Sequence, residues 1–195
     1  MKPWIPVAIA VFAANAFFFE WRTSLDADNP GPEAFQPVPA GLTAPTVTLL
    51  TGDGRERTLA DWRGQTAIVT LWATWCEVCR EEMPELDRIA LELAEDNIAV
   101  LPVSLDRHPR ALDLVRGYYD RHGLANLPVL HDRDAALSGK VTPTATPTTL
   151  IIDRNGKVIA SATGRVRWMD PKVKALLADL GHARSSEDAR ALITR

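Results

Sequence analysis

The chain contains two cysteines, separated by two residues, at the point where one sequence pattern ends and another begins. The run at 67–71 is apolar and mostly β-branched, which is typical of a buried strand. After the cysteines, large apolar residues recur between 83 and 93 at the spacing of one helix face. Cys76 and Cys79 are therefore predicted to lie where a strand ends and a helix begins.

This position has a chemical consequence for the two thiols. The free N–H groups of the first helical turn and the helix dipole stabilise negative charge at a helix N-terminus. Cys76 is therefore predicted to form a thiolate readily, and the thiolate is the form that attacks disulfides. The spacing brings Cys79 back one turn later, close enough for a disulfide. We interpret Cys76 as the exposed nucleophile and Cys79 as the buried resolving thiol.

Two plainer explanations of the cysteine pair are weaker. A zinc site would need two further ligands, but there is no other cysteine, and the histidines at 108, 122, 131 and 182 lack paired-ligand spacing. We expect His108 and His131 in loops or on the surface. A structural disulfide closing so small a loop would constrain the unfolded chain little. The pattern favours a redox-active pair that needs no metal or other cofactor.

Two segments carry a resemblance to a known superfamily. Trp-Ala-Thr-Trp-Cys-Glu-Val-Cys at 72–79, with Pro84 following, resembles the thioredoxin active site, and Ala-Thr-Pro-Thr-Thr at 145–149 resembles the cis-proline loop. More narrowly, Arg-Glu-Glu-Met-Pro at 80–84 and the stretch 147–156 are similar to the membrane-anchored, extracytoplasmic TlpA/ResA/CcmG group. The similarity runs from about residue 44 to 181.

The sequence also predicts the elements around the motif. Alternation from Thr46, a turn at 52–54 and a return at 55–59 indicate an N-terminal hairpin, and a short helical turn is expected at 59–64. A second buried strand is predicted at 98–105, although Pro102 cannot donate to a central ladder. The remaining expected elements are a helix at 109–122, an extended piece at 128–130, a short helix at 132–138, a hairpin at 148–163 on Asn155-Gly156, and a helix at 171–181.

These elements predict an α/β fold. Strand–helix–strand units give parallel pairing and hairpins give antiparallel pairing, so we expect a central mixed sheet flanked by helices. The resemblance implies the same architecture, the thioredoxin-like fold with an N-terminal β-hairpin extension. We divide the chain into an anchor at 1–22, a Pro-rich linker at 23–44, a thioredoxin-like domain at 45–182 and a charged C-terminal tail at 183–195.

The N-terminal segment is interpreted as an uncleaved membrane anchor. From residue 3 to residue 19 only Asn15 is polar, and roughly 17 to 20 apolar residues span a bilayer. Trp4 and Trp21 stand at its ends, where interfacial aromatics are favoured. A signal peptide is the alternative, since 14–16 has the small-x-small form, but cleavage there would expose three phenylalanines. A buried core helix is disfavoured by the prolines that follow. Lys2 favours an inside N-terminus.

The residues flanking the cysteines have expected roles. By resemblance, Trp75 forms part of the docking surface, and Trp72 packs in the core beside the site. The carboxylate of Glu77 should oppose thiolate formation at Cys76, although a carboxylate is also simply favourable in a first helical turn.

The second motif has an expected role in substrate binding. By resemblance, the Thr146–Pro147 bond is cis and stands opposite Cys76, where the loop offers backbone groups to an extended substrate peptide. An ordinary trans bond is the alternative.

Two positions depart from the related proteins. Thr70 stands where thioredoxins carry a buried Asp, and Ala99 where the ResA-like group often has a Glu. The sequence therefore does not identify the base that deprotonates Cys79, and Glu77 and water are the candidates.

The resemblance implies a thiol–disulfide oxidoreductase anchored in the bacterial inner membrane, its catalytic domain facing the periplasm, that reduces disulfides in specific proteins. In the related group these include apocytochrome c and the copper-site cysteines of cytochrome oxidase assembly; the segment 164–168 is closer to TlpA than to CcmG. Expected partners are proteins with disulfides or dithiols and an upstream membrane electron donor. A net charge of −3 gives no argument for nucleic acid.

Three rival functions remain on the same residues. A disulfide-introducing oxidant would use the same motif in reverse. A peroxiredoxin-like peroxidase is disfavoured, because no Pro-x-x-x-Thr-x-x-Cys arrangement surrounds Cys76. A Cu(I)-binding thiol module suits soft thiolates, but the chain has three methionines and no Met/His cluster to extend such a site.

Overall fold

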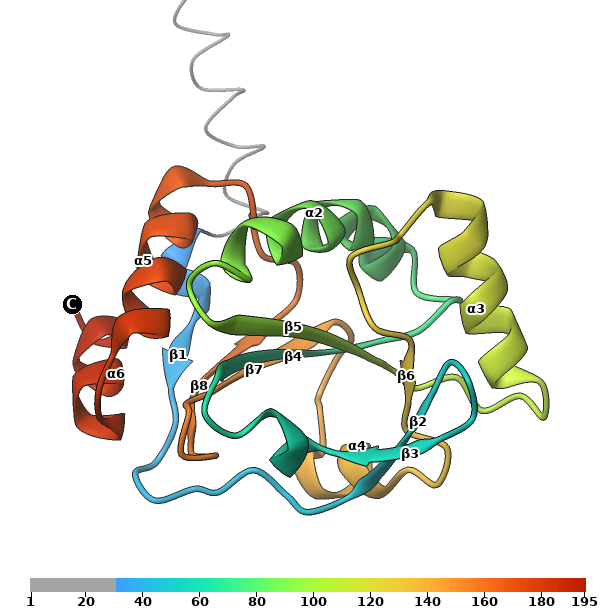
Figure 1. Ribbon diagram of the computed structural model, residues 1–195, viewed down its shortest axis with the longest axis horizontal. Helices are drawn as coiled ribbons and strands as arrows, with labels where there is room; N and C mark the ends of the chain where they lie inside the picture. The colour runs from blue at the N-terminus through green and yellow to red at the C-terminus, as the bar shows by residue number, and fades with distance from the viewer. Residues whose placement is uncertain (1–30) are drawn as a thin grey trace, which may run out of the picture. The chain divides into compact units, whose positions relative to one another are not determined.

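A mixed sheet of eight strands runs through the described part of the protein, with helices on both of its faces (Figure 1). The computed structural model describes residues 31–195. The expected anchor at 1–22 and the first part of the expected linker, up to residue 30, lie outside the described residues. Within residues 31–195, no helix combines the length and the apolar character needed to cross a membrane.

The strands stand in the sheet in the order β1-β8-β7-β4-β5-β6-β2-β3. Their bounds are β1 (Gln36–Pro37), β2 (Thr48–Thr51), β3 (Glu56–Thr58), β4 (Thr66–Trp72), β5 (Ile98–Ser104), β6 (Leu130–His131), β7 (Thr148–Ile152) and β8 (Val158–Thr163). The helices are η1 (Pro32–Ala34), η2 (Leu59–Trp62), α2 (Glu77–Leu93), α3 (Ala111–His122), α4 (Ala136–Val141), α5 (Pro171–His182) and α6 (Ser186–Ile193).

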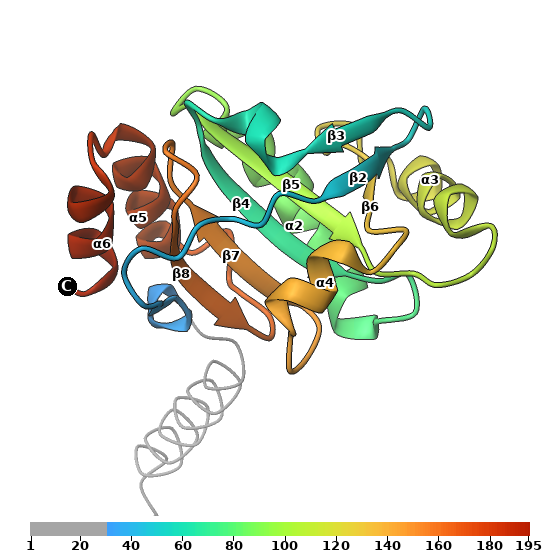
Figure 2. The same ribbon diagram turned by 90° about the horizontal axis from the view of Figure 1, so that it is seen from below.

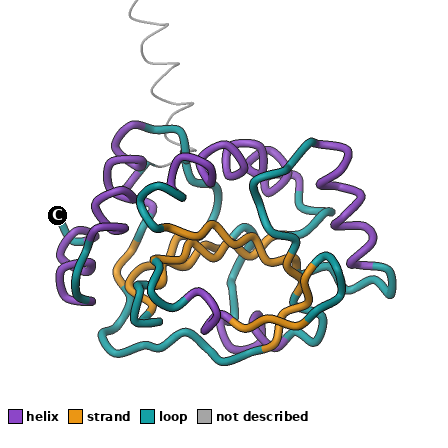
Figure 3. The backbone as a smooth tube through the Cα atoms, in the orientation of Figure 1, coloured by secondary structure: helices purple, strands orange, loops and turns teal. Residues whose placement is uncertain are grey.

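Strand β4 is the centre of this arrangement. All its residues are buried, and it lies parallel to β5 and antiparallel to β7. Because side chains alternate along a strand, Ile68 and Trp72 pack in the core beneath α2, α3 and α5. Val69 and Leu71 pack on the other face with Leu137 of α4, which Figure 2 shows in front of the strands. Figure 3 shows helices on both sides of the strands, as the sequence predicted.

The expected hairpins are both present. β2 pairs antiparallel with β3 and joins the sheet through β6, which confirms the N-terminal hairpin. β7 and β8 pair antiparallel around the turn at Asn155 and Gly156, and Gly156 has the positive φ of 78° that such a turn requires.

Pro102 lies inside β5, although a proline is unexpected in a central strand. The backbone of Leu105 donates to Trp72 in β4, and Ser104 accepts from Asp132 beyond β6. Even-numbered residues of β5 therefore direct their backbone groups toward β6. Since β6 pairs with β5 only at Val103 and Ser104, the missing N–H of Pro102 removes no ladder bond. The short length of β6 makes the proline compatible with the strand.

The expected linker extends too far into the chain. Its described part, 31–44, packs on the domain instead of running free: Phe35 is 2% exposed and lies in the main core. β1 pairs with β8, and Thr43 bridges to Lys157. The physical reason is that β8 would otherwise present the unpaired backbone of a sheet edge.

The prediction of a charged tail at 183–195 is also wrong, because most of this segment forms helix α6. The side chains of Ser185 and Asp188 cap the first turn reciprocally, and Ala189 is buried in the main core. The guanidinium of Arg190 donates to the carbonyls of Val38, Pro39 and Val158 at 2.6, 2.8 and 3.2 Å. Helix α6 thus fastens the segment after β1 against β8.

We expect Arg190→Ala to lower the free energy of unfolding of the fragment 31–195 by about 2 kcal/mol, because it leaves three backbone carbonyls without a charged donor. Urea unfolding monitored by circular dichroism measures this. Arg195→Ala, at an exposed position near the end of α6, is the matched control and should change stability little. Equal effects of the two substitutions would contradict the role given to Arg190.

Candidate active site

The two cysteines lie at the N-terminus of α2, as predicted, and form a disulfide with each other. Cys76 is the N-cap residue, and the backbone N–H of Cys79 donates to its sulfur at 3.2 Å. This N–H of the first helical turn therefore points at the Cys76 sulfur. This geometry stabilises a thiolate on Cys76 once the disulfide is reduced.

Cys76 is less exposed than the sequence led us to expect. Its exposed fraction is 7%, against 1% for Cys79, so the order of accessibility is as predicted but neither sulfur lies open. Trp75 is the exposed residue of the motif, at 66%. Cys76 is covered because its sulfur lies 3.7 Å from the carbonyl oxygen of Thr146 in the facing loop.

The facing loop holds the second motif. The Thr146–Pro147 peptide bond is cis, which confirms that prediction, and the loop stands beside the Cys76 sulfur. The carbonyl of Pro147 accepts from the backbone of Gly164 at 2.8 Å. The loop is thus connected to the segment between β8 and α5. The binding of a substrate peptide along it stays a prediction.

Trp72 packs in the core, as predicted, at 0% exposure. Its ring lies 5.3 Å from that of Tyr118 and 6.1 Å from that of Tyr119, between centroids. The hydroxyl of Tyr118 donates to the carbonyl of Arg80 in α2. Trp72 therefore packs against the tyrosine that is hydrogen-bonded to the helix carrying the cysteines.

A groove of about 570 Å³ runs beside the disulfide, between the first turns of α2 and helix α3. Glu77, whose tuning of Cys76 stays a prediction, is exposed on its wall. The lining residues are Thr74, Glu77, Arg80, Glu81, Leu114, Tyr118, Arg121 and His122. Thr74 and Glu77 flank Cys76 in the chain, so the groove opens close to the disulfide, although neither cysteine lines it.

Asp106, just after β5, holds the loop that precedes the cysteines. Its carboxylate accepts from the backbone and the hydroxyl of Thr74 at 3.0 and 2.6 Å, and from the hydroxyl of Ser104 at 2.7 Å. His131 lies 2.9 Å from the Asp106 carbonyl and is 5% exposed, so our expectation of a loop or surface position was wrong. The hydrogen bonds to Asp106 hold the backbone in place at Thr74, two residues before Cys76.

Neither departure from the related proteins supplies a titratable group. Thr70 shares a hydrogen bond of 3.1 Å with Thr149, its register partner on β7, and Ala99 pairs with Ala67 on β4. The proton acceptor for Cys79 therefore has to come from elsewhere.

The structure shows a buried carboxyl group, one helical turn after Cys79, that our sequence analysis missed. Glu82 is 1% exposed and follows Cys79 by three residues on the same face of α2, where side chains are neighbours. Its Oε1 accepts from the backbone of Val166 at 3.1 Å and from the indole of Trp168. Its Oε2 is buried and has no hydrogen-bond partner among residues 31–195.

Burial raises the pKa of Glu82 to about 7, although the hydrogen bonds from Val166 and Trp168 and the charge of Arg165 lower it. A carboxyl with this pKa can both accept and release a proton near neutral pH. The sequence held a signal for it: residue 82 falls on the face of α2 that buries Cys79 and Leu86. A charged residue on a buried helix face is unusual unless it is paired.

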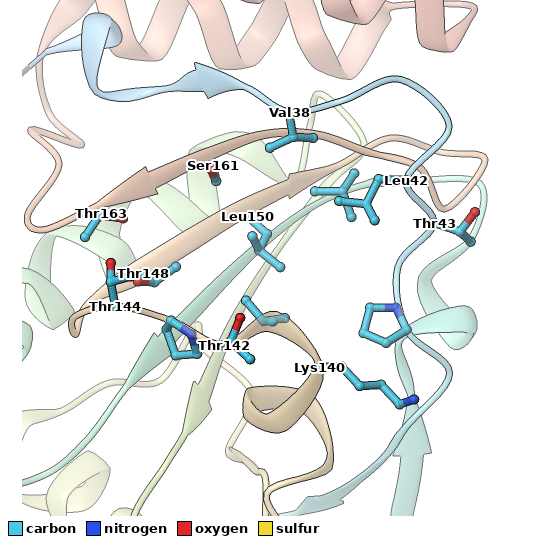
Figure 4. Close-up of a pocket in the computed structure, with 14 residues that line it drawn as sticks. Val38, Leu42, Thr43, Lys140, Thr142, Thr144, Thr148, Leu150, Ser161 and Thr163 are labelled. Atoms are coloured by element: carbon cyan, nitrogen blue, oxygen red, sulfur yellow. The ribbon is translucent and has the colours of Figure 1, made fainter.

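A second, more enclosed and mostly apolar cavity, of about 410 Å³, lies elsewhere (Figure 4). Residues 38–45, the chain at 140–144 and strands β7 and β8 line it, and neither cysteine takes part. Among the described residues there is also no group of three or more His, Cys, Asp or Glu side chains that could hold a metal ion.

The fold and this site define a thioredoxin-like protein with a redox-active cysteine pair. The model of the AhpC/TSA family matches residues 40–161, more than half of the chain, and the chain belongs to that family.

Curated and solved relatives specify the class further. The chain is 33% identical over 135 residues to the thiol-disulfide oxidoreductase ResA of Geobacillus thermodenitrificans (strain NG80-2), covering 69% of this chain and 75% of that one. The exposed lipoprotein thioredoxin Etrx1 of Streptococcus pneumoniae strain TIGR4 matches with 28% identity and a TM-score of 0.56, over 64% and 93% of the two chains. A Chlorobium tepidum structure classed with the thiol:disulfide interchange proteins DsbE shares the fold: TM-score 0.63, 24% identity, 72% and 98% coverage. The protein is a ResA-like thiol–disulfide oxidoreductase.

The raised pKa of Glu82 predicts a pH dependence of stability in the oxidised fragment 31–195. The folded pKa of about 7 exceeds the ordinary 4.5, so the folded state holds the proton more tightly. The stability this contributes is complete below pH 4.5 and is lost as pH rises through 7. Relative to Glu82→Gln, the wild type should lose up to about 3 kcal/mol between pH 4.5 and about pH 8.

Chemical unfolding across that pH range, with the disulfide intact, measures the difference. Glu77→Gln, at an exposed position of the same helix, is the control and should run parallel to the wild type. A wild-type profile that runs parallel to that of Glu82→Gln would contradict the raised pKa.

Proposed function

We propose that the protein is a reductant of disulfides in specific partner proteins. The observation that carries this is the placement of Cys76 at the helix N-cap, bonded to Cys79, with the buried Glu82 one turn beyond Cys79. The Cys76 thiolate attacks a partner disulfide, forms a mixed disulfide and releases one partner thiolate. The Cys79 thiolate then attacks Cys76, which closes the Cys76–Cys79 disulfide and releases the second partner thiolate. Two electrons pass to the partner, and an upstream thiol donor restores the dithiol.

In this sequence of steps Glu82 takes the proton of Cys79. A buried thiol loses its proton with difficulty, and Glu82 is a neighbouring carboxyl whose pKa of about 7 suits proton exchange at neutral pH. When the disulfide is reduced again, the same carboxyl returns the proton to the Cys79 sulfur.

The two carboxyl groups around the cysteines support the direction of electron flow. Glu77 lies between the cysteines in the chain and Glu82 lies one turn beyond Cys79. Negative charge beside a thiolate disfavours it, so it disfavours the reduced form relative to the disulfide. This lowers the reduction potential, as a reductant requires.

The resemblance to the TlpA/ResA/CcmG group supports the finer assignment. The partners would be apocytochrome c cysteines during cytochrome c maturation, or copper-site cysteines during cytochrome oxidase assembly. The domain would face the periplasm, attached to the inner membrane by residues 1–22 and supplied with electrons by a membrane donor. The pneumococcal relative is described as an exposed lipoprotein, which agrees with an extracytoplasmic site of action.

The reduction potential of the Cys76–Cys79 pair tests the direction. We expect a value near or below that of thioredoxin, about −270 mV, when the fragment 31–195 is equilibrated in thiol/disulfide buffers and its free thiols are counted. The fragment begins at residue 31 because Phe35 and β1 belong to the folded unit. A value near about −120 mV would identify an oxidant instead.

Membrane attachment is tested separately from catalysis. We expect the full chain expressed in a bacterium to stay with the membranes after washing at alkaline pH, because the apolar run at 3–19 is long enough to span them. The same chain without residues 1–22 should be released. Recovery of the full chain in the wash, or its cleavage near residue 16, would contradict the anchor.

A further inference from the structure

The segment Gly164 to Trp168, here called the strap, connects β8 to α5 and touches both halves of the active site. At one end the backbone of Gly164 donates to the carbonyl of Pro147 in the cis-proline loop. At the other end Val166 and Trp168 donate to Glu82 of α2. Arg165 ties the strap to the same helix through Glu81 and Glu85, at 3.2 and 3.1 Å.

The two donors of the strap act on a single oxygen of the carboxyl group. The Val166 backbone and the Trp168 indole both bond to Oε1 of Glu82, whereas Oε2 is buried without a hydrogen-bond partner anywhere in the described chain. Two donors on one oxygen fix the rotation of a carboxyl group that otherwise has three free side-chain torsions. The carboxyl is therefore held with one oxygen committed and the other left free for a proton.

Packing alone does not explain a tryptophan at 168. Its side chain is fully buried and lies 6.1 Å from the ring of Phe35, a contact that a phenylalanine could also make. What only the indole adds is the N–H directed at Oε1. Buried polar groups are costly unless they are paired, so this donor and the carboxyl depend on each other.

We propose that Trp168 is a positioning residue, whose indole N–H holds Oε1 of Glu82 so that Oε2 exchanges the proton of Cys79. The inference rests on the proposed function, in which Glu82 is the proton acceptor. The S–H bond of Cys79 breaks and an O–H bond forms at Oε2. The Cys79 sulfur then attacks the Cys76 sulfur, and the partner leaves as a thiolate. The other charged groups around Glu82 are Arg165 of the strap and Glu85 of α2.

Kinetics of the full chain in detergent micelles test the proposal. The rate at which the reduced protein reduces a disulfide-bonded peptide is measured as a function of pH for the wild type, Trp168→Phe, Glu82→Gln and the double variant. We expect Trp168→Phe to slow the reaction roughly ten-fold, the effect of one charge-assisted hydrogen bond. The inflection of the pH–rate profile that is due to Glu82 should also move to higher pH, because the carboxylate loses a hydrogen-bond donor. In the Glu82→Gln background the same substitution should change the rate less than two-fold.

Trp62→Phe, which removes an indole far from the site, is the matched control and should leave the profile unchanged. A loss of rate in Trp168→Phe that is equally large in the Glu82→Gln background would assign Trp168 a packing role and overturn the proposal. A Glu82→Gln variant with the wild-type profile would instead overturn the proton acceptor of the proposed function. The two failures are thus distinguishable.

A second measurement does not require the tryptophan variant to fold. In ¹⁵N-labelled full chain in micelles, one indole N–H signal should shift with pH in the wild type and stay fixed in Glu82→Gln. Its midpoint should differ between the oxidised and the reduced protein, because only the reduced protein holds a Cys79 thiol that exchanges its proton with Glu82. Equal midpoints in the two redox states, or no titrating indole, would overturn the proposal.

Discussion

The structure depends on the junction between β4 and α2. β4 is buried on both faces and hydrogen-bonded on both edges, so it allows no shift of register without exposing its side chains. Asp106 binds the backbone and the hydroxyl of Thr74 just beyond its end. Cys76 therefore follows a fixed strand end and lies at the N-cap of α2. The redox site is a consequence of where the central strand stops.

The carboxyl group of Glu82, on the helix that follows this junction, is costly to bury. Glu82 stands on the face of α2 that otherwise holds Met83, Leu86 and Ile89, where an apolar residue would cost no desolvation. Its burial raises its pKa, and one of its oxygens is left without a partner in the described residues. A group that costs folding stability and is still held by two donors of a distant segment is best explained by proton exchange with Cys79.

The sequence predicted the elements that local patterns encode, and failed where contacts between distant segments decide. Helix α2 and the hairpin at Gly156 follow from apolar periodicity and from turn chemistry, so both were found. The segment 31–44 looked like a spacer because its prolines carry no periodic pattern. It is ordered by pairing with β8 and by burying Phe35, which no local pattern shows. Helix α6 did carry a local signal, the capping residues Ser185 and Asp188, which we overlooked.

The sequence by itself determined the chemistry of the cysteine pair, because a spacing of three residues on one helix fixes their separation and places the first at the N-terminus. It also predicted the mixed pairing of the sheet, because crossovers give parallel strands and hairpins give antiparallel ones. Only the tertiary structure decided the surroundings of Glu82, the group that we propose takes the proton of Cys79. The indole of Trp168 lies 86 residues from Glu82 in the chain, and burial, which raises the pKa of Glu82 to about 7, exists only after the strap has closed over α2. The desolvation of Glu82 depends on packing between distant segments, so no short stretch of sequence can show it.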